Sequence, residues 1–260
     1  RGGDPREEER EEDKRVRHRA SIVSRKGEGR GLAEGSSLAL SKEPSLERNG
    51  GLARTNEREM EFGVAMPDWA EGEQKKLPEY LKTLEERMRV VHRFARLNVE
   101  HDTGGPFAAG VFELKTGRVV SIGVNRVVPG RCSTAHAEVM AIALAQKRLG
   151  VHDLGGEGLP DHQLVVNWLP CCMCFGATLW SGVTSLAIAG SDGSLEEITG
   201  FDEGPRIDNA KELAKRGIEF FDNILKDEAI DTFKLFRDSG RLVYNGRGGG
   251  ACIPVPADAP

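Results

Sequence analysis

The sequence has no long apolar run, few cysteines and no excess of positive charge. Its longest apolar stretch, residues 139–145, is far shorter than the roughly 18 residues that a membrane helix needs. The 36 Lys and Arg face 41 Asp and Glu, and a net charge of −5 gives no basic footprint for nucleic acid or anionic lipid. Five cysteines are too few and too clustered for a disulfide framework. We therefore expect no membrane segment, no nucleic-acid partner and a cytoplasmic, reducing location.

Charged and aromatic residues are distributed unevenly along the 260 residues. Residues 1–75 contain 32 charged side chains, and their only aromatics are Phe62 and Trp69. Such a segment cannot bury enough apolar surface to offset its chain entropy. The other 185 residues contain 45 charged side chains, an ordinary fraction for a folded domain. We expect three parts: a disordered charged arm over 1–78, a folded domain over 79–247 and a flexible tail over 248–260.

Within 79–247, amphipathic helices alternate with short apolar strands. Leu84, Met88, Val91 and Ala95 recur every three or four residues, which predicts a helix that ends before Gly104. The alternation indicates an α/β domain with helices covering a sheet. The other expected elements are strands at 107–113, 119–125, 163–168, 185–189 and 218–221, and helices at 135–149, 171–180, 211–216 and 228–236.

Three side chains form a candidate metal site. Cys171 and Cys174 stand one turn apart on the same face of a predicted helix, whose N-terminus favours thiolates over thiols. With His136 as a third ligand, one tetrahedral position stays open, which is the arrangement of a catalytic rather than a structural zinc site. Glu138, in the first turn of the helix after His136, is placed to accept a proton from an activated water and pass it to a substrate.

These residues carry a family resemblance. His136-Ala137-Glu138, followed after 31 residues by Pro170-Cys171-Cys172-Met173-Cys174, matches the H-x-E…P-C-x-x-C signature of zinc-dependent base deaminases. The resemblance implies a cytidine-deaminase-like fold, a three-layer α/β/α arrangement with a mixed central sheet. It also implies one zinc per subunit on His136, Cys171 and Cys174, with Glu138 as the proton shuttle.

Segments outside the metal motif resemble bacterial guanine deaminases of this fold, which hydrolyse guanine to xanthine and ammonia. They are Gly-Gly-Pro-Phe-Ala-Ala at 104–109, Asn-Arg-Val-Val-Pro-Gly-Arg-Cys-Ser at 125–133, and Gly-Phe-Asp-Glu-Gly-Pro-Arg at 200–206. The resemblance extends over roughly 84–247. It implies a small purine as the substrate, and a homodimer in which subunits sometimes exchange C-terminal segments.

The resemblance also suggests how the substrate is held. Asn125 would hydrogen-bond the purine, and Phe107 and Phe201 would sandwich its ring. Glu203 would be a second carboxylate that binds the base and helps to protonate the leaving amine, in its own subunit or in its neighbour. Each has a structural alternative: a turn residue for Asn125, core packing for the two phenylalanines and a solvated loop residue for Glu203.

The sequence departs from the family pattern at two places. Leu169 stands where many relatives carry Glu before the motif proline, and residues 207–210 lack an expected aromatic.

Several other functions stay open. A tRNA adenosine deaminase shares the zinc motif, but it needs a basic surface, whereas residues 76–260 have 21 Lys and Arg against 24 Asp and Glu. Deamination of guanosine, cytosine or cytidine, and a non-catalytic zinc module that recruits a partner, are the remaining alternatives.

Overall fold

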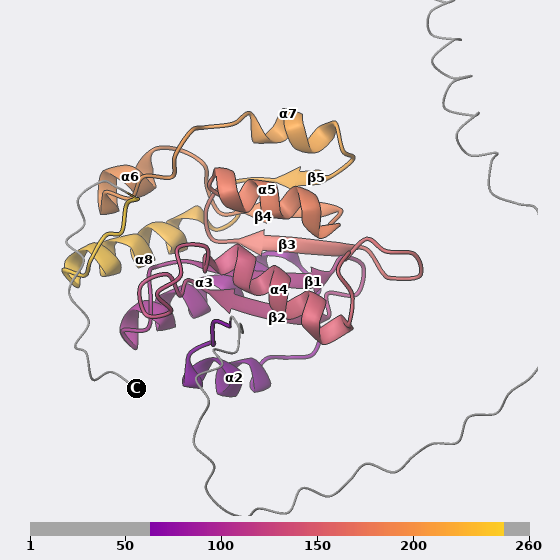
Figure 1. Cartoon of the computed structure of the whole chain (residues 1–260), viewed down its shortest axis with the longest axis horizontal. Helices are drawn as coiled ribbons and strands as arrows, with labels where there is room; N and C mark the ends of the chain where they lie inside the picture. Colours follow the sequence, from indigo (N-terminus) through magenta and orange to yellow (C-terminus); the bar gives the residue numbers. More distant parts are fainter. Residues whose placement is uncertain (1–62, 247–260) are drawn as a thin grey trace, which may run out of the picture. The chain divides into compact units, whose positions relative to one another are not determined.

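A mixed five-stranded sheet forms the centre of the computed structural model, which describes residues 63–246 (Figure 1). The strands lie in the order β2-β1-β3-β4-β5. β1 pairs antiparallel with β2 and β3, whereas β4 is parallel to both β3 and β5. Their bounds are β1 (Ala108–Glu113), β2 (Val119–Val124), β3 (His162–Val166), β4 (Ser185–Ile188) and β5 (Glu219–Phe221).

Helices cover both faces of this sheet (Figure 1). α3 (Leu84–Glu100) and α8 (Lys226–Asp238) pack on one face, and α4 (Ala137–Leu149) and α5 (Cys172–Ser181) pack on the other. The result is the expected three-layer α/β/α arrangement with a mixed sheet. Three short helices complete the described chain: α2 (Asp68–Lys75), α6 (Ser194–Thr199) and α7 (Asn209–Ala214).

The alternation of side chains along β1 creates two hydrophobic cores. Ala108 and Phe112 point into the core beneath α3 and α8, whereas Ala109 and Val111 point into the core beneath α4 and α5. All four side chains are fully buried. A strand that is covered on both faces is apolar throughout, which explains why the sequence shows short apolar runs rather than a polar and apolar alternation.

Local sequence signals account for the ends of the longer helices. Thr83 and Glu86 form a capping box at the start of α3: Glu86 N donates to Thr83 Oγ1 at 3.2 Å, and Thr83 N donates to Glu86 Oε2 at 3.0 Å. Gly150 ends α4 in the left-handed conformation with φ of 70°, where glycine is favoured. The long helices predicted from the sequence are therefore confirmed to within a few residues.

The folded part begins earlier than the expected boundary at residue 79. Residues 68–75, assigned to a disordered arm, form α2, in which Ala70 is buried. Trp69 packs on the core, and its ring contacts Phe94 with centroids 5.7 Å apart. The composition of this segment is polar, but one large aromatic side chain anchors it. Residues 1–62 of the expected arm and the expected tail at 248–260 lie outside the described residues.

Between residues 63 and 246, none of the helices combines the length and the apolar composition that a membrane span requires.

Candidate active site

The register of the sheet brings three separate segments to one edge. Ala108 pairs with Val124 and Ala109 pairs with Val166, so the residues next to these pairs become neighbours. They are Phe107, Asn125 and Asn167. Asn125 N donates to the Phe107 carbonyl at 3.0 Å, and Asn167 Nδ2 donates to the Pro106 carbonyl at 2.9 Å. This edge, at the carboxyl end of β3, is where the candidate site lies.

The N-terminus of α4 presents His136 and Glu138. His136 is the N-cap, with extended backbone (φ −69°, ψ 155°), and Glu138 lies in the first turn. On a regular helix, side chains two residues apart point in different directions. Because His136 has extended rather than helical backbone, its side chain can face the same space as that of Glu138. Both His136 and Glu138 line one cavity.

The N-terminus of α5 supplies two thiols. Cys171 is the N-cap and Cys174 lies one turn further, buried completely. Cys171 Sγ is 3.6 Å from His136 Nδ1, and one ligand atom from each of His136, Cys171 and Cys174 lies within 4.8 Å of the others. Among residues 63–246, they are the one group of three His, Cys, Asp or Glu side chains that converges in this way.

The donor set and its spacing fit a zinc ion. Bonds of 2.0–2.3 Å to nitrogen and sulfur place the ligands of a tetrahedral zinc about 3.3–3.8 Å apart, and the 3.6 Å between Cys171 and His136 lies in this range. Three protein ligands leave one position for water or substrate. The structure thus brings together the three predicted metal ligands.

The electrostatics of the thiols also favour a cation. A hydrogen bond from Cys174, aided by His136, lowers the pKa of Cys171 to about 4. The same hydrogen bond, together with burial, raises the pKa of Cys174 well above its usual value. Burial lowers the pKa of His136, but its contact with Cys171 and the charge of Glu138 outweigh this, so that the net shift is upward. Cys171 is therefore a thiolate at neutral pH, and its negative charge favours a cation at the point where the three side chains meet.

Two carboxyl groups, those of Glu138 and Glu203, line the cavity, and their surroundings raise the pKa of each. Burial raises the pKa of Glu138, whose side chain lies within α4 and is almost completely covered. Burial, the charge of Cys171 and the charge of Glu138 raise the pKa of Glu203 to about 8. Glu203 belongs to the loop after α6 and lines the same cavity. A protonated Glu203 at neutral pH could donate a proton while Glu138 accepts one.

The cavity is large enough for a small heterocycle. The space open to the centre of a water-sized sphere is about 170 Å³, roughly ten times what a single buried water needs. Asn125, Phe107 and Phe201 line it, so all the predicted substrate contacts lie in the same cavity as His136, Glu138 and Glu203. The other lining residues are Gly105, Val127, Val128, Val166, Trp168, Leu169, Asp202, Leu242, Tyr244 and Gly246.

The two phenylalanines do not form the expected sandwich. The rings of Phe107 and Phe201 meet edge to face at 63°, with centroids 5.2 Å apart. A flat ring between two others needs about 7 Å, which is twice a carbon–carbon contact distance. Edge-to-face contact is a preferred geometry of neighbouring aromatic rings. Phe107 and Phe201 are therefore adjoining walls of the cavity, not two parallel faces around a ligand.

Tyr244 and Leu242 line the cavity but were not predicted. They lie in the segment after α8, which Asn245 ties to the loop before Glu203: Asp202 N donates to Asn245 Oδ1 and Asn245 Nδ2 donates to the Gly200 carbonyl, both at 2.9 Å. Tyr244 supplies an aromatic side chain that the sequence of residues 207–210 lacks. Only a Leu-x-Tyr pattern near the C-terminus marks this segment, and it is too short to be informative alone.

Sequence comparison identifies a family profile and related proteins. The profile described as cytidine and deoxycytidylate deaminase zinc-binding region matches residues 81–189. A guanine deaminase of Bacillus subtilis is 34% identical over 138 residues, covering 52% of this chain and 81% of the relative. A probable cytosine deaminase of Schizosaccharomyces pombe is 30% identical over 141 residues, covering 52% of this chain and 82% of the relative.

Solved structures extend the similarity to most of the described chain. A guanine deaminase from Nitrosomonas europaea is 42% identical, with a TM-score of 0.65, over 68% of this chain and 97% of that chain. A structure in complex with 2,6-diaminopurine is 43% identical, with a TM-score of 0.65, over 71% of this chain and 97% of that chain. Another, a variant in complex with 8-azaguanine, is 42% identical with the same TM-score, over 69% of this chain and 98% of that chain.

Proposed function

This chain belongs to the cytidine and deoxycytidylate deaminase family, and we propose that it is a zinc-dependent hydrolase that converts guanine and water to xanthine and ammonia. One observation carries the proposal. Glu138, Glu203 and Asn125 line a single cavity beside the cluster of His136, Cys171 and Cys174. The identity to two guanine deaminases, over 81% and 97% of their lengths, supports guanine as the substrate.

His136, Cys171 and Cys174 would hold one zinc ion per chain. When bound, the ion supplies Lewis acidity that lowers the pKa of a water to about 7 and so provides a nucleophile near neutrality. The N-termini of α4 and α5, which carry the three ligands, keep their side chains at a fixed spacing. Covered by the two helices and the sheet, Cys174 is inaccessible to solvent.

Glu138 carries the proton to the purine ring, and Glu203 carries the proton to the leaving amine. Glu138 accepts a proton from the attacking water and delivers it to a ring nitrogen of guanine as the bond between C2 and oxygen forms. Glu203, whose pKa is raised by burial, donates to the amino group as the bond between C2 and nitrogen breaks. The amine leaves as ammonia, and the proton of the new C2 hydroxyl returns to Glu203 as the C2 carbonyl of xanthine forms.

Asn125, Phe107 and Phe201 orient the base. An amide offers both a donor and an acceptor, which suits the edge of a purine, and Asn125 is buried at the floor of the cavity. Phe107 and Phe201 supply an apolar wall against a ring face or edge. Together these side chains hold C2 near the reacting groups, where correct placement contributes strongly to the rate.

A substrate panel tests this function. The zinc-loaded chain is incubated separately with guanine, guanosine, adenine, cytosine and cytidine, and with a tRNA that has adenosine in its anticodon, and released ammonia is measured. We expect ammonia from guanine at a much higher kcat/KM than from the others. Ammonia only from cytosine, cytidine or tRNA would assign a different substrate, and ammonia from none would favour a non-catalytic zinc module.

Assembly and location are part of the same proposal. The resemblance to guanine deaminases and the 88% exposed side chain of Trp180 on α5 support a homodimer. Glu203 of the same chain lines the cavity, which supports a site completed within one subunit. Sedimentation equilibrium of the purified chain measures whether it is a homodimer.

The cysteines bear on the location. They are free thiols, in keeping with a cytoplasmic enzyme: Cys132, Cys171, Cys172 and Cys174.

A further inference from the structure

We propose that Asn98 is a positioning residue for the purine pocket, because its buried amide fixes the two backbone segments that carry Asn125 and Phe107. This inference rests on the proposed function of the site. Asn98 belongs to α3, lies outside the lining of the cavity and is no part of the metal motif. Its role is to set the position of groups that touch the substrate.

One amide nitrogen bridges two separate strand ends. Asn98 Nδ2 donates to the carbonyl of Gly105 at 2.9 Å and to the carbonyl of Asn125 at 3.0 Å. Gly105 precedes β1 and Asn125 follows β2, and both residues line the cavity. Asn98 is 0% exposed, so these hydrogen bonds are not exchanged for bonds to water. The side chain therefore sets the spacing between the two segments.

The remaining contacts of Asn125 show why this bridge matters for a ligand. Its backbone N–H donates to the Phe107 carbonyl at 3.0 Å, and its Oδ1 accepts from Val127 N at 3.3 Å. Together with the bond from Asn98, they fix the backbone and the side-chain oxygen of Asn125. Among residues 63–246, the Nδ2 group of Asn125 donates to no acceptor, which leaves it for a base in the cavity.

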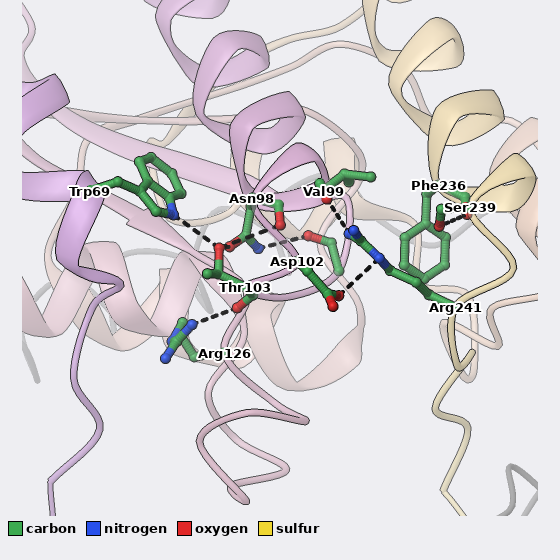
Figure 2. A network of polar contacts seen from close by, with 10 residues as sticks. Trp69, Asn98, Val99, Asp102, Thr103, Arg126, Phe236, Ser239 and Arg241 are labelled. Carbon is green, nitrogen blue, oxygen red and sulfur yellow. Dashed lines mark hydrogen bonds and ion pairs between the residues drawn. The ribbon is translucent and has the colours of Figure 1, made fainter.

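Asn98 is itself oriented by a chain of donors that begins on α2 (Figure 2). Trp69 Nε1 donates to Thr103 Oγ1 at 3.0 Å, and Thr103 Oγ1 donates to Asn98 Oδ1 at 2.8 Å. Because Oδ1 accepts from Thr103, the amide group must present its NH₂ to the two carbonyls. The hydrogen bonds thus run from Trp69 through Thr103 and Asn98 to the backbone carbonyls of the pocket, which accept the last two.

A second connection ties the segment just before α2 to the same turn. Arg126, the residue after Asn125, donates from Nη1 to the Thr103 carbonyl and from Nε to the Ala65 carbonyl at 3.1 Å. On the other side of the turn, Arg241 pairs with Asp102 at 2.9 Å (Figure 2). The segment that contains α2 lies before the residues matched by the family profile, yet it supports the wall of the pocket.

The test is a double-mutant cycle measured on guanine turnover. Asn98→Ala should lower kcat/KM by about 10–100-fold, mainly through KM, because a misplacement of about 1 Å at a site costs up to this much. In an Asn125→Ala background, the same substitution should change kcat/KM by no more than about twofold, since the group that it positions is gone. Trp69→Phe keeps an aromatic side chain, although a smaller one, and removes the donor; it should raise KM by roughly 2–5-fold.

Gln163→Ala is the matched control. Gln163 is also a buried amide with two partners: Oε1 accepts from Arg87 Nη1 at 2.8 Å, and Nε2 donates to Ser185 Oγ at 2.9 Å. It lies near the start of β3, whereas Val166, at the end of this strand, lines the cavity. Gln163→Ala should lower the melting temperature as Asn98→Ala does, but leave KM unchanged.

The outcomes separate the inference from the function that it rests on. Equal KM values for wild type and Asn98→Ala, or an undiminished effect of Asn98→Ala in the Asn125→Ala background, would overturn the positioning role. Failure of the wild type to release ammonia from guanine would instead overturn the proposed function. The crystal structure of Asn98→Ala then decides the inference: displaced carbonyls of Gly105 and Asn125 support it, and unmoved ones refute it. Should Asn98→Ala not fold, Trp69→Phe provides the same comparison of KM in both backgrounds.

Discussion

Phe107 and Phe201 touch edge to face in the lining of the cavity, their ring centroids 5.2 Å apart. Phe201 also stacks on Phe236 at 5.3 Å, so α8 holds its ring in place. One strand end and one loop therefore form a single aromatic wall. A ligand that contacts this wall meets a surface that is already assembled, because both rings are packed against the core.

Phe201→Leu tests the wall. An aromatic contact contributes about 0.5–1.5 kcal/mol beyond the area it buries, so KM for guanine should rise by roughly 3–10-fold while kcat changes little. Steady-state kinetics with guanine measure this change. Phe220→Leu on β5, outside the cavity, is the control and should leave KM as it is. An unchanged KM for Phe201→Leu would remove this ring from the binding surface.

Glu138→Gln tests the division of the proton transfers. The amide keeps the size of the buried side chain but cannot accept a proton, so kcat should fall by about 10²–10⁴-fold. Zinc content, measured by mass spectrometry of the digested protein, should remain one per chain because Glu138 is not in the ligand cluster. Substantial turnover by this variant would assign the proton transfer to another group.

The local part of the site could be predicted from the sequence, but its walls could not. His136, Glu138, Cys171 and Cys174 come from two helix N-termini, and short spacings fix their geometry. Tyr244, by contrast, reaches the cavity through tertiary contacts of a segment with no periodic pattern. Such long-range contacts depend on packing, which neither spacing nor propensity encodes.

The same limit applies to the fold. The apolar runs of the five strands and the stripes of α3, α4 and α8 are strong signals, and the sheet follows from them. α2 has a polar composition and contains Gly72, and its helix depends on Trp69 packing against α3. α6 is only six residues long, too short for a hydrophobic period to be recognised.

Cys174→Ser tests the metal cluster. Loss of one thiolate from a three-ligand site should remove most of the zinc after dialysis, and with it the activity. Zinc is counted per chain by mass spectrometry. Cys132→Ser, a free cysteine outside the cluster, is the control and should keep its zinc. Full zinc occupancy in Cys174→Ser would contradict the ligand assignment.

Gly104→Ala tests the close approach of backbones behind the pocket. A Cβ at this position would lie 2.0 Å from the Asn125 carbonyl oxygen and 2.5 Å from Asn98 Nδ2. Backbone must move to make room, and we expect a loss of about 1–3 kcal/mol in the free energy of unfolding and a higher KM. Gly176→Ala on α5 meets no atom within 4 Å and should stabilise the helix slightly. Urea unfolding compares the two, and equal stabilities would contradict this geometry.

The buried side chain of His92 makes the free energy of unfolding depend on pH. Burial within the core lowers its pKa from 6.5 to about 4. Between these values the unfolded chain binds a proton that the folded chain does not, so the free energy of unfolding falls as the pH falls from 6.5 to about 4 and this group changes it no further below pH 4. The free energy of unfolding should fall by up to about 3 kcal/mol from this group. His92→Leu should flatten the profile between pH 6.5 and 4, and the exposed His152→Gln should not; identical profiles for wild type and His92→Leu would refute the prediction.

The reaction itself is tested most directly by the mass of the purine formed when the zinc-loaded chain acts on guanine in oxygen-18-labelled water. Hydrolysis replaces the bond between C2 and the amino nitrogen with a bond to water oxygen, so the predicted product is xanthine with one labelled oxygen, together with one equivalent of ammonia. Guanine recovered unchanged by the wild-type chain, or xanthine without the label, would contradict hydrolytic deamination at this site.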